Sequence, residues 1–135
     1  MKIPAKAEYA LKALLELSLH WPSQEPLAIS AIAARQRIPL KFLTQILLSL
    51  KSLGLVESSR GKQGGYMLRK EPSAINLTDV LGPYIFRGSK QKSFSVINEV
   101  LQEMDTLALA YLNKMTFDQL LKRERASAKM PMYTI

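Results

Sequence analysis

Residues 38–69, IPLKFLTQILLSLKSLGLVESSRGKQGGYMLR, decide the fold of this chain. In the first half of this stretch, apolar residues recur at spacings of three and four, which places them on one stripe of a helix. The stripe consists of Leu43, Ile46, Leu47, Leu50 and Leu53. The opposite face carries Lys41, Thr44, Gln45, Ser49 and Ser52. Gly54 accepts the left-handed conformation that commonly follows a last helical turn, so the pattern predicts a helix that ends near Leu53.

A β-hairpin is predicted directly after this helix. Two short β-prone runs, residues 55–60 and 66–69, flank a glycine-rich loop. Arg60 and Lys62 place positive charge at its tip, on a backbone that can approach a partner closely. A polar-faced helix followed by a basic hairpin is typical of a winged helix-turn-helix. In that arrangement the helix enters the DNA major groove and the wing contacts the backbone or the minor groove.

Apolar periodicity predicts two helices ahead of this stretch. Residues 5–21 form the first helix. Its apolar stripe is Ala7, Ala10, Leu11, Leu14, Leu17 and Trp21, and its outward side chains are Lys6, Lys12 and Glu16. After a short strand at residues 27–29 that pairs with the wing, Ser30 caps a second helix that runs to about Gln36. Together with the helix from Leu40 to Leu53, these helices form the core.

Beyond the wing, a short helix and a long helix are predicted. Asn76 or Thr78 caps the short helix, which Gly82 and Pro83 end. The long helix spans residues 94–115 and has an apolar stripe with strict spacing: Phe94, Ile97, Leu101, Met104, Ala108, Tyr111 and Met115. This much apolar surface outside a small core favours a helix shared between two subunits, so we expect these residues to form a homodimer interface. The alternative is that the long helix packs only on its own domain.

The predicted fold is therefore mainly α, a winged helix-turn-helix domain with a two-stranded wing and a long C-terminal dimerisation helix. We expect a DNA-binding domain at residues 1–83 and a loop at residues 84–93. The dimerisation helix and a last short helix, opened by a capping box of Thr116 and Gln119, occupy residues 94–122. Residues 123–135 form a tail that is expected to be disordered or draped over a neighbour.

Composition excludes several classes of protein. The chain has 135 residues, no cysteine and a single histidine, His20. Disulfides, thiol catalysis and cysteine-ligated clusters are ruled out, a zinc site is a poor match, and no metal or cofactor is expected. No enzyme is expected, because the sequence lacks a histidine pair, a phosphate-loop signature and paired carboxylates with an evident pocket. No apolar run approaches the ~20 residues that span a bilayer and none resembles a secretory signal, so we expect a cytoplasmic protein with no membrane partner.

The formal net charge of +8 indicates an anionic partner. Most of the basic excess lies in residues 1–70, the same half as the predicted helix and wing. This distribution favours double-stranded DNA, while positive charge by itself also fits RNA or an anionic membrane. RNA is less favoured, because only Phe42 and Tyr66 offer aromatic rings near the basic surface. The main alternative is a winged helix used for protein interaction, but that use predicts an acidic or apolar recognition face instead of a cationic one.

Five motifs give the chain a family resemblance: Tyr9-Ala10-Leu11, residues 38–45, Gly54-Leu55-Val56, Arg60-Gly61 and Gly64-Gly65-Tyr66. With these motifs the chain resembles the Rrf family of bacterial winged-helix transcription regulators, over residues 1 to about 122. That family includes the iron-sulphur regulator IscR, the nitric-oxide sensor NsrR and the cysteine regulator CymR. The resemblance implies a homodimer that binds a pseudo-palindromic operator and often represses transcription.

The resemblance also implies which residues face DNA. Lys41, Phe42, Thr44 and Gln45 lie on the DNA side of the recognition helix, and Arg60 and Gly61 enter the minor groove. Arginine suits a narrow, electronegative minor groove, and glycine lets the backbone come close. The full set of expected DNA contacts is Lys6, Lys41, Phe42, Thr44, Gln45, Arg60, Gly61, Lys62 and Gln63. The alternative for Arg60 and Lys62 is that they are solvated loop charges.

Two departures from the family pattern limit what the resemblance implies. Thr44 and Gln45 stand where many members have Glu-Gln, and threonine cannot replace a glutamate that accepts from a cytosine amino group. Cluster-binding members place three cysteines before the long helix, where this chain has residues 86–93 and no cysteine. Iron-sulphur, nitric-oxide and thiol sensing are therefore not transferred. Any effector is a small molecule or a protein, and no residue identifies it.

Overall fold

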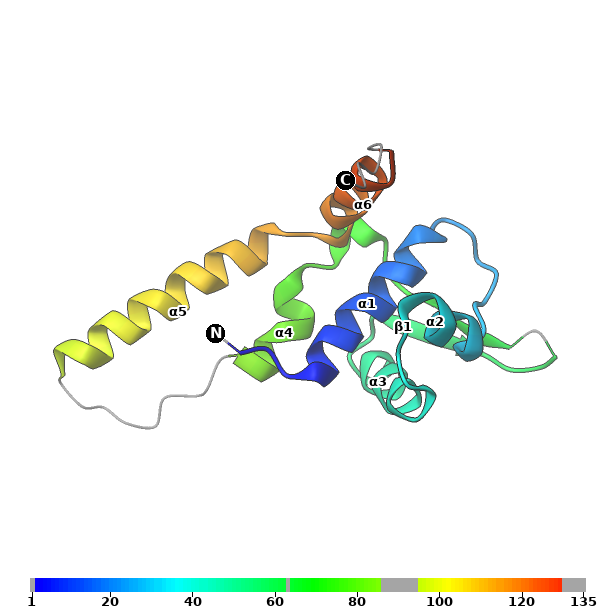
Figure 1. Ribbon diagram of the computed structural model, residues 1–135, viewed down its shortest axis with the longest axis horizontal. Helices are drawn as coiled ribbons and strands as arrows, with labels where there is room; N and C mark the ends of the chain where they lie inside the picture. Colours follow the sequence, from blue (N-terminus) through cyan, green and yellow to red (C-terminus); the bar gives the residue numbers. More distant parts are fainter. Residues whose placement is uncertain (1, 63, 86–94, 130–135) are drawn as a thin grey trace, which may run out of the picture.

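The computed structural model describes residues 2–62, 64–85 and 95–129. They form a mainly helical chain with a two-stranded antiparallel sheet, as predicted. The elements are α1 (Ala5–Leu19), α2 (Ile29–Gln36), α3 (Leu40–Ser52), β1 (Val56–Ser59), β2 (Gly65–Leu68), the 3-10 turn η1 (Pro72–Ala74), α4 (Leu77–Ile85), α5 (Val96–Lys114) and α6 (Phe117–Lys129). Figure 1 shows the first three helices gathered with the sheet in one body, from which α5 projects. None of the described helices has the length and apolar character needed to cross a bilayer.

The predicted recognition helix forms as α3. Its apolar stripe is buried in the main core at Leu43, Ile46, Leu47 and Leu50. The helix ends at Ser52, and Gly54 follows with a φ of +78°, which confirms the predicted glycine stop. Leu53 departs from the prediction, since it is 51% exposed. It lies at the C-cap, beyond the turns that face the core.

Glu16 is buried, so its predicted outward position is wrong. Its side chain lies between α1 and α2, and the residue is 5% exposed. Gln36 Nε2 donates to Glu16 Oε1 at 3.1 Å, while Arg35 Nη1 and His20 Nε2 lie 3.4 and 3.0 Å from Oε2. A buried carboxylate is tolerated only when it is paired and hydrogen-bonded, and these three partners provide that compensation. The pairing ties α1 to α2.

The segment before α2 contributes less strand than predicted. Only Leu27 pairs with the wing, through an isolated bridge to Tyr66 with N···O distances of 2.8 and 2.9 Å. The prediction that Ser30 caps α2 is wrong, because Ala28 occupies the N-cap and no side chain caps the helix. The bridge fixes the backbone just ahead of Ala28. The Ala28 carbonyl oxygen then accepts from the N–H groups of residues 31 and 32.

Asn76 is the residue that caps α4. The Asp79 N–H donates to Asn76 Oδ1 at 3.1 Å, and the Asn76 N–H donates to Asp79 Oδ2 at 3.0 Å. Contrary to the predicted stop at Gly82 and Pro83, the helix continues to Ile85. Pro83 lies inside the helix and, without an N–H group, cannot donate to the carbonyl oxygen four residues earlier.

After α5 the chain returns to the first body. The Leu77 N–H donates to the Met115 carbonyl at 3.0 Å, and the Phe117 N–H donates to the Ile75 carbonyl at 2.9 Å. These two hydrogen bonds make an isolated bridge between the segments before α4 and before α6. Phe117 is fully buried in the main core with residues of α1 and α3. The start of α6 is therefore part of the same core as the recognition helix.

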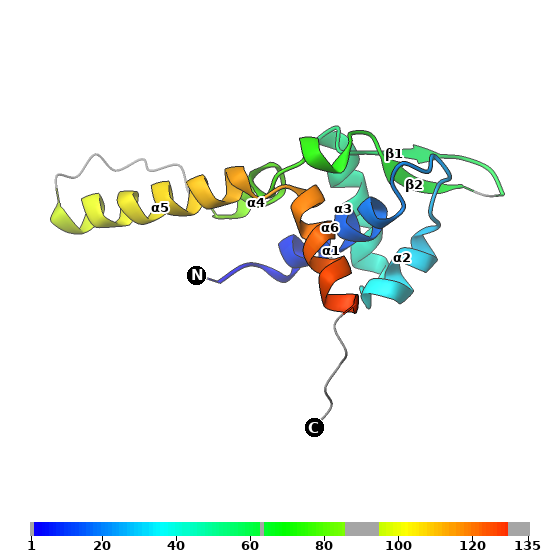
Figure 2. The same ribbon diagram turned by 90° about the horizontal axis from the view of Figure 1, so that it is seen from above.

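The last helix is longer than predicted. Its capping box is confirmed, since Gln119 N–H donates to Thr116 Oγ1 and Thr116 N–H donates to Gln119 Oε1, each at 3.2 Å. The helix runs to Lys129 and contacts α1, which it crosses in Figure 2. Residues 123–129 of the predicted tail are thus helical, because the packed first turns at Phe117 and Leu121 nucleate a helix that continues into solvent. Residues 130–135 of that tail lie outside the described residues.

Candidate nucleic-acid interface

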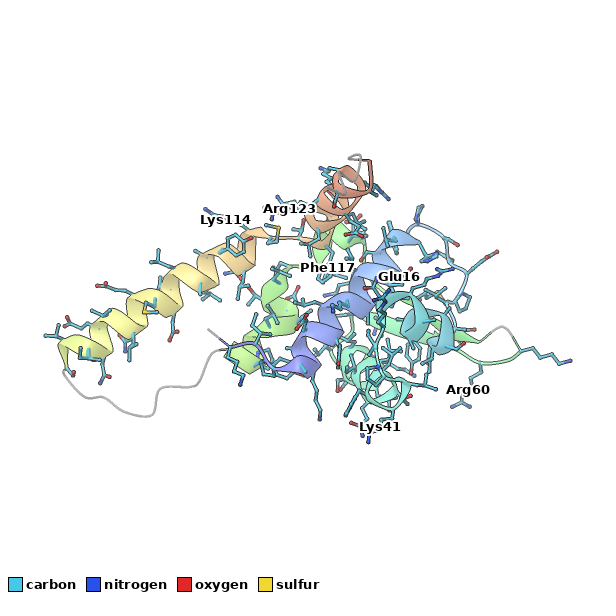
Figure 3. The ribbon with its side chains drawn as sticks, in the orientation of Figure 1. Glu16, Lys41, Arg60, Lys114, Phe117 and Arg123 are labelled. Atoms are coloured by element: carbon cyan, nitrogen blue, oxygen red, sulfur yellow. The ribbon has the colours of Figure 1, made fainter. Side chains whose placement is uncertain are left out.

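The outward face of α3 mixes polar and apolar side chains. Lys41, Thr44 and Gln45 are exposed, as expected of a face that reads DNA. Figure 3 shows Lys41 directed away from the body of the protein. Leu40 and Leu48 lie on the same face and are each 55% exposed. Neither leucine is among the predicted contacts, because leucine is usually a core residue and only the packing shows which leucines stay outside.

Phe42 supports α3 from its inner edge. Its half-buried ring stacks on Tyr9 of α1, with ring centroids 6.4 Å apart and an interplanar angle of 23°. The Lys41 ammonium lies 5.3 Å from the Phe42 ring centroid, within the range of a cation–π interaction. Phe42 therefore joins α3 to α1 and steadies Lys41, which is a positioning contribution to the predicted DNA face.

The wing brings its basic tip out beyond the core. Tyr66 and Leu68 on β2 are buried and anchor the sheet, while Arg60, Gly61 and Lys62 are exposed past the end of β1. Gln63, which is also predicted to contact DNA, lies outside the described residues. The exposed tip thus combines two cations with a glycine whose φ is +119°, a value that other residues rarely adopt.

Gly65 sets the position of the wing against the domain. A Cβ atom at this residue would overlap the carbonyl oxygen of Leu27, so only glycine permits the bridge between Leu27 and β2. On the other strand, Lys51 Nζ at the end of α3 donates to Ser58 Oγ at 2.7 Å. The wing is therefore fixed to both the segment before α2 and the recognition helix.

A groove separates the wing from the first turns of α3. Leu40 and Thr44 line it from α3, and Ser59 and Arg60 line it from the wing. Residues predicted to contact the major groove and the minor groove thus border one continuous surface. On the other side of α3, Lys6 and Gln45 both line a second groove between α1, α3 and α4.

The predicted dimer stripe is mostly exposed on α5. Ile97, Leu101, Met104 and Tyr111 are between 50% and 66% exposed, and Ala108 is half-buried. Phe94 lies outside the described residues. Met115 is 7% exposed, because the chain turns back toward the core at this residue and its carbonyl pairs with Leu77. Met115 therefore belongs to the interior of its own chain and does not extend the exposed stripe.

Residues 3–83 match the Rrf2 family, which is described as an iron-dependent transcriptional regulator. This chain belongs to the Rrf2 family. The matched segment contains α1, α2, α3 and the wing, so it covers the DNA-facing surface described above.

Curated relatives of this Rrf2 chain are named as transcriptional regulators. A helix-turn-helix regulator of Synechocystis sp. is 42% identical over 81 residues, covering 60% of this chain and 54% of that protein. IscR of Photorhabdus laumondii is 42% identical over 82 residues, covering 60% of this chain and 49% of that protein. The chain spans about half the length of the curated relatives it matches. The family is one of regulators and is not enzymatic.

Solved structures of regulators share the whole described fold. IscR of T. potens superposes with a TM-score of 0.82 at 31% identity, covering 98% of this chain and 93% of that chain. CymR, the global cysteine regulator of B. subtilis, superposes with a TM-score of 0.80 at 27% identity, covering 91% and 98%. The predicted winged helix-turn-helix fold is therefore confirmed.

The side chains of this Rrf2 chain do not fit a cysteine-ligated iron cluster. The sequence has no cysteine, including residues 86–93, where the resemblance places the ligands. Across residues 2–62, 64–85 and 95–129, no three His, Cys, Asp or Glu side chains group together in a way that could hold a metal ion. His20 is engaged by Glu16 and Arg35. The chain therefore lacks the side chains that would hold a cysteine-ligated cluster.

Proposed function

We propose that this Rrf2 chain acts as a homodimer that binds a pseudo-palindromic DNA operator and represses transcription without a cysteine-ligated cluster. The observation that carries the proposal is the common surface formed by the outward face of α3 and the basic wing. Figure 3 shows Lys41 and Arg60 at the lower right of the molecule, and Arg60 lines the groove that Leu40 and Thr44 border from α3.

In this proposal α3 lies in the major groove and the wing tip lies over the adjacent minor groove. Lys41, Thr44 and Gln45 face the base edges, since they are exposed on the first turns of the helix. Arg60 and Lys62 are exposed beside Gly61, whose missing side chain allows close approach to the sugar-phosphate backbone. Lys6 adds a cation along the second groove, which Gln45 also lines at the other edge of α3.

The exposed side of α5 supports the proposed dimer. Large apolar residues are left uncovered along several turns of this projecting helix: Val96, Ile97, Val100, Leu101, Met104, Leu107 and Tyr111, each between 46% and 73% exposed. A contiguous apolar patch of this kind marks an interaction site, and a two-fold axis lets the same patch cover itself. Two identical DNA-reading surfaces related by a two-fold axis match an operator with two symmetric half-sites.

The test is binding of the purified chain to the DNA upstream of its own gene, compared with a random duplex across a range of salt concentrations. We expect a preference of about a thousandfold or more for one upstream site, with steep salt dependence on both duplexes. A reporter gene behind that site is expected to be less active when the chain is present. Equal binding to both duplexes, together with no enriched site in a genome-wide pulldown, would favour the protein-interaction use of the winged helix instead.

A further inference from the structure

An apolar row runs along the outward face of the recognition helix. Leu40, Thr44 and Leu48 are spaced by four residues, so their side chains follow one another along successive turns. Both leucines are 55% exposed, and Thr44 is exposed between them. The two uncovered leucines leave apolar surface in contact with water along this face.

The Thr44 side chain completes this row. Its hydroxyl Oγ1 donates to the Leu40 carbonyl oxygen at 3.1 Å, a bond within the helix itself. The hydroxyl proton is thereby occupied by the backbone, so the γ-methyl group is left as the side chain's free apolar contact. The outward face of α3 therefore carries three apolar groups in a row: the Leu40 side chain, the Thr44 methyl group and the Leu48 side chain.

One DNA feature in the major groove matches an apolar contact. The C5-methyl group of thymine projects there, whereas cytosine presents an amino donor and guanine presents two acceptors. Aliphatic side chains cannot pair with a cytosine amino group or with guanine acceptors, whereas they make van der Waals contact with the thymine methyl group, so they favour thymine at the positions that they touch.

We infer that Leu40, Thr44 and Leu48 contact thymine methyl groups in the major groove, so that each operator half-site has thymine at the positions that these side chains touch. This inference rests on the proposed function, since it requires α3 to lie in the groove. It assigns Leu48 a specificity role, and it gives Thr44 a methyl contact in place of a hydrogen bond donated to a base.

The experiment removes thymine methyls one at a time. An operator is first selected from random duplexes with the full chain, and each thymine is then replaced by deoxyuridine, which lacks only the C5-methyl group. We expect about fourfold weaker binding for each methyl that is read, the effect of one buried methyl-sized group. Leu48→Ala is expected to weaken binding to the thymine operator and to abolish the effect of deoxyuridine at one position in each half-site.

Matched variants distinguish the contribution of the Thr44 methyl group from that of its hydroxyl group, and both from the effect of removing any exposed leucine. Thr44→Val keeps methyl groups without a hydroxyl and is expected to retain sensitivity to deoxyuridine, whereas Thr44→Ser is expected to lose it at one position. Leu53→Ala removes a leucine that is also about half exposed but lies past the end of α3, and it is expected to leave thymine sensitivity intact. Circular dichroism and urea unfolding check that each variant folds.

The outcomes distinguish the inference from the function on which it rests. A selected operator that binds equally well with deoxyuridine at every thymine would overturn the inference and leave the proposed function standing. The same conclusion would follow if the Leu48→Ala variant and the Thr44→Ser variant both kept full sensitivity to deoxyuridine. If no sequence is enriched, the proposed function fails and the inference fails with it.

Discussion

At Gly65 the wing lies against the backbone of the segment before α2. A Cβ atom there would overlap the Leu27 carbonyl oxygen, whereas a Cβ on Gly82 in α4 would meet only Thr78 Cγ2 at 3.6 Å. We expect Gly65→Ala to lower the free energy of unfolding by about 1 kcal/mol or more, because the bridge between Leu27 and Tyr66 must shift. The control Gly82→Ala is expected to be neutral or to stabilise by up to about 1 kcal/mol. Urea unfolding measures both, and equal stability of the two variants would contradict the packing described for Gly65.

Arg60 carries the minor-groove part of the proposed interface. We expect Arg60→Ala to weaken binding to the operator by about 1–3 kcal/mol and to relax the base preference beneath the wing, because a specific contact is lost. Arg123→Ala removes the same charge from α6, on the opposite side of the molecule in Figure 3, and is expected to change affinity little. Titrations on operator and random duplexes measure both effects. Equal losses on the two duplexes would make Arg60 a phosphate contact without sequence preference.

At the scale of single elements, α5 exposes a row of large apolar side chains that a monomer would leave in contact with water. Leu101 lies on its apolar stripe and is 50% exposed, and Gln102 is its exposed polar neighbour. We expect Leu101→Glu to separate the proposed dimer, because a carboxylate cannot be buried between two apolar faces without a partner. Gln102→Glu adds the same charge and is expected to leave the dimer intact. Analytical ultracentrifugation measures the oligomeric state, and a fully dimeric Leu101→Glu protein would refute this interface.

The elements differ in how far the sequence predicts them. The α3 helix and the wing are recognisable because periodicity and glycine positions are local signals, and both elements stand where residues 38–69 indicate. The burial of Glu16 is not predictable in this way, since it depends on Arg35 and Gln36 of another helix. The place of Phe117 in the core likewise depends on the chain returning after α5. Local patterns thus predict elements, whereas long-range partners decide which of their side chains are covered.

The candidate site follows the same rule. The exposed cations Lys41, Arg60 and Lys62 are predictable because charged residues rarely occupy a core. The exposed leucines of α3 are not, because leucine serves core and surface alike and only the three-dimensional packing leaves Leu40 and Leu48 outside. The sequence therefore identifies the charged side chains of the candidate site and does not identify its exposed leucines.

At the scale of the whole molecule, the proposed dimer makes a geometric prediction about DNA. A rigid dimer presents its two recognition helices at a fixed spacing, so both half-sites must lie on one face of the duplex. We expect an insertion of about five base pairs between the half-sites, half of a helical turn, to reduce binding to that of a single half-site. The same insertion outside the operator is expected to have no effect. Gel-shift titrations compare the three duplexes, and undiminished binding across the central insertion would contradict a rigid dimer.

The hydrogen bonds that join residue 77 to residue 115, and residue 75 to residue 117, have an evolutionary consequence. They hold the two ends of the excursion through α4 and α5 side by side on the body of the protein. Since the departure and return points are neighbours, changes at residues 95–110, none of which is buried, need not move α3 or the phenylalanine that fills the core. Sequence change can therefore accumulate in this part of the excursion, where it alters the proposed dimer and its half-site spacing, while the fold of the proposed DNA-reading surface is retained.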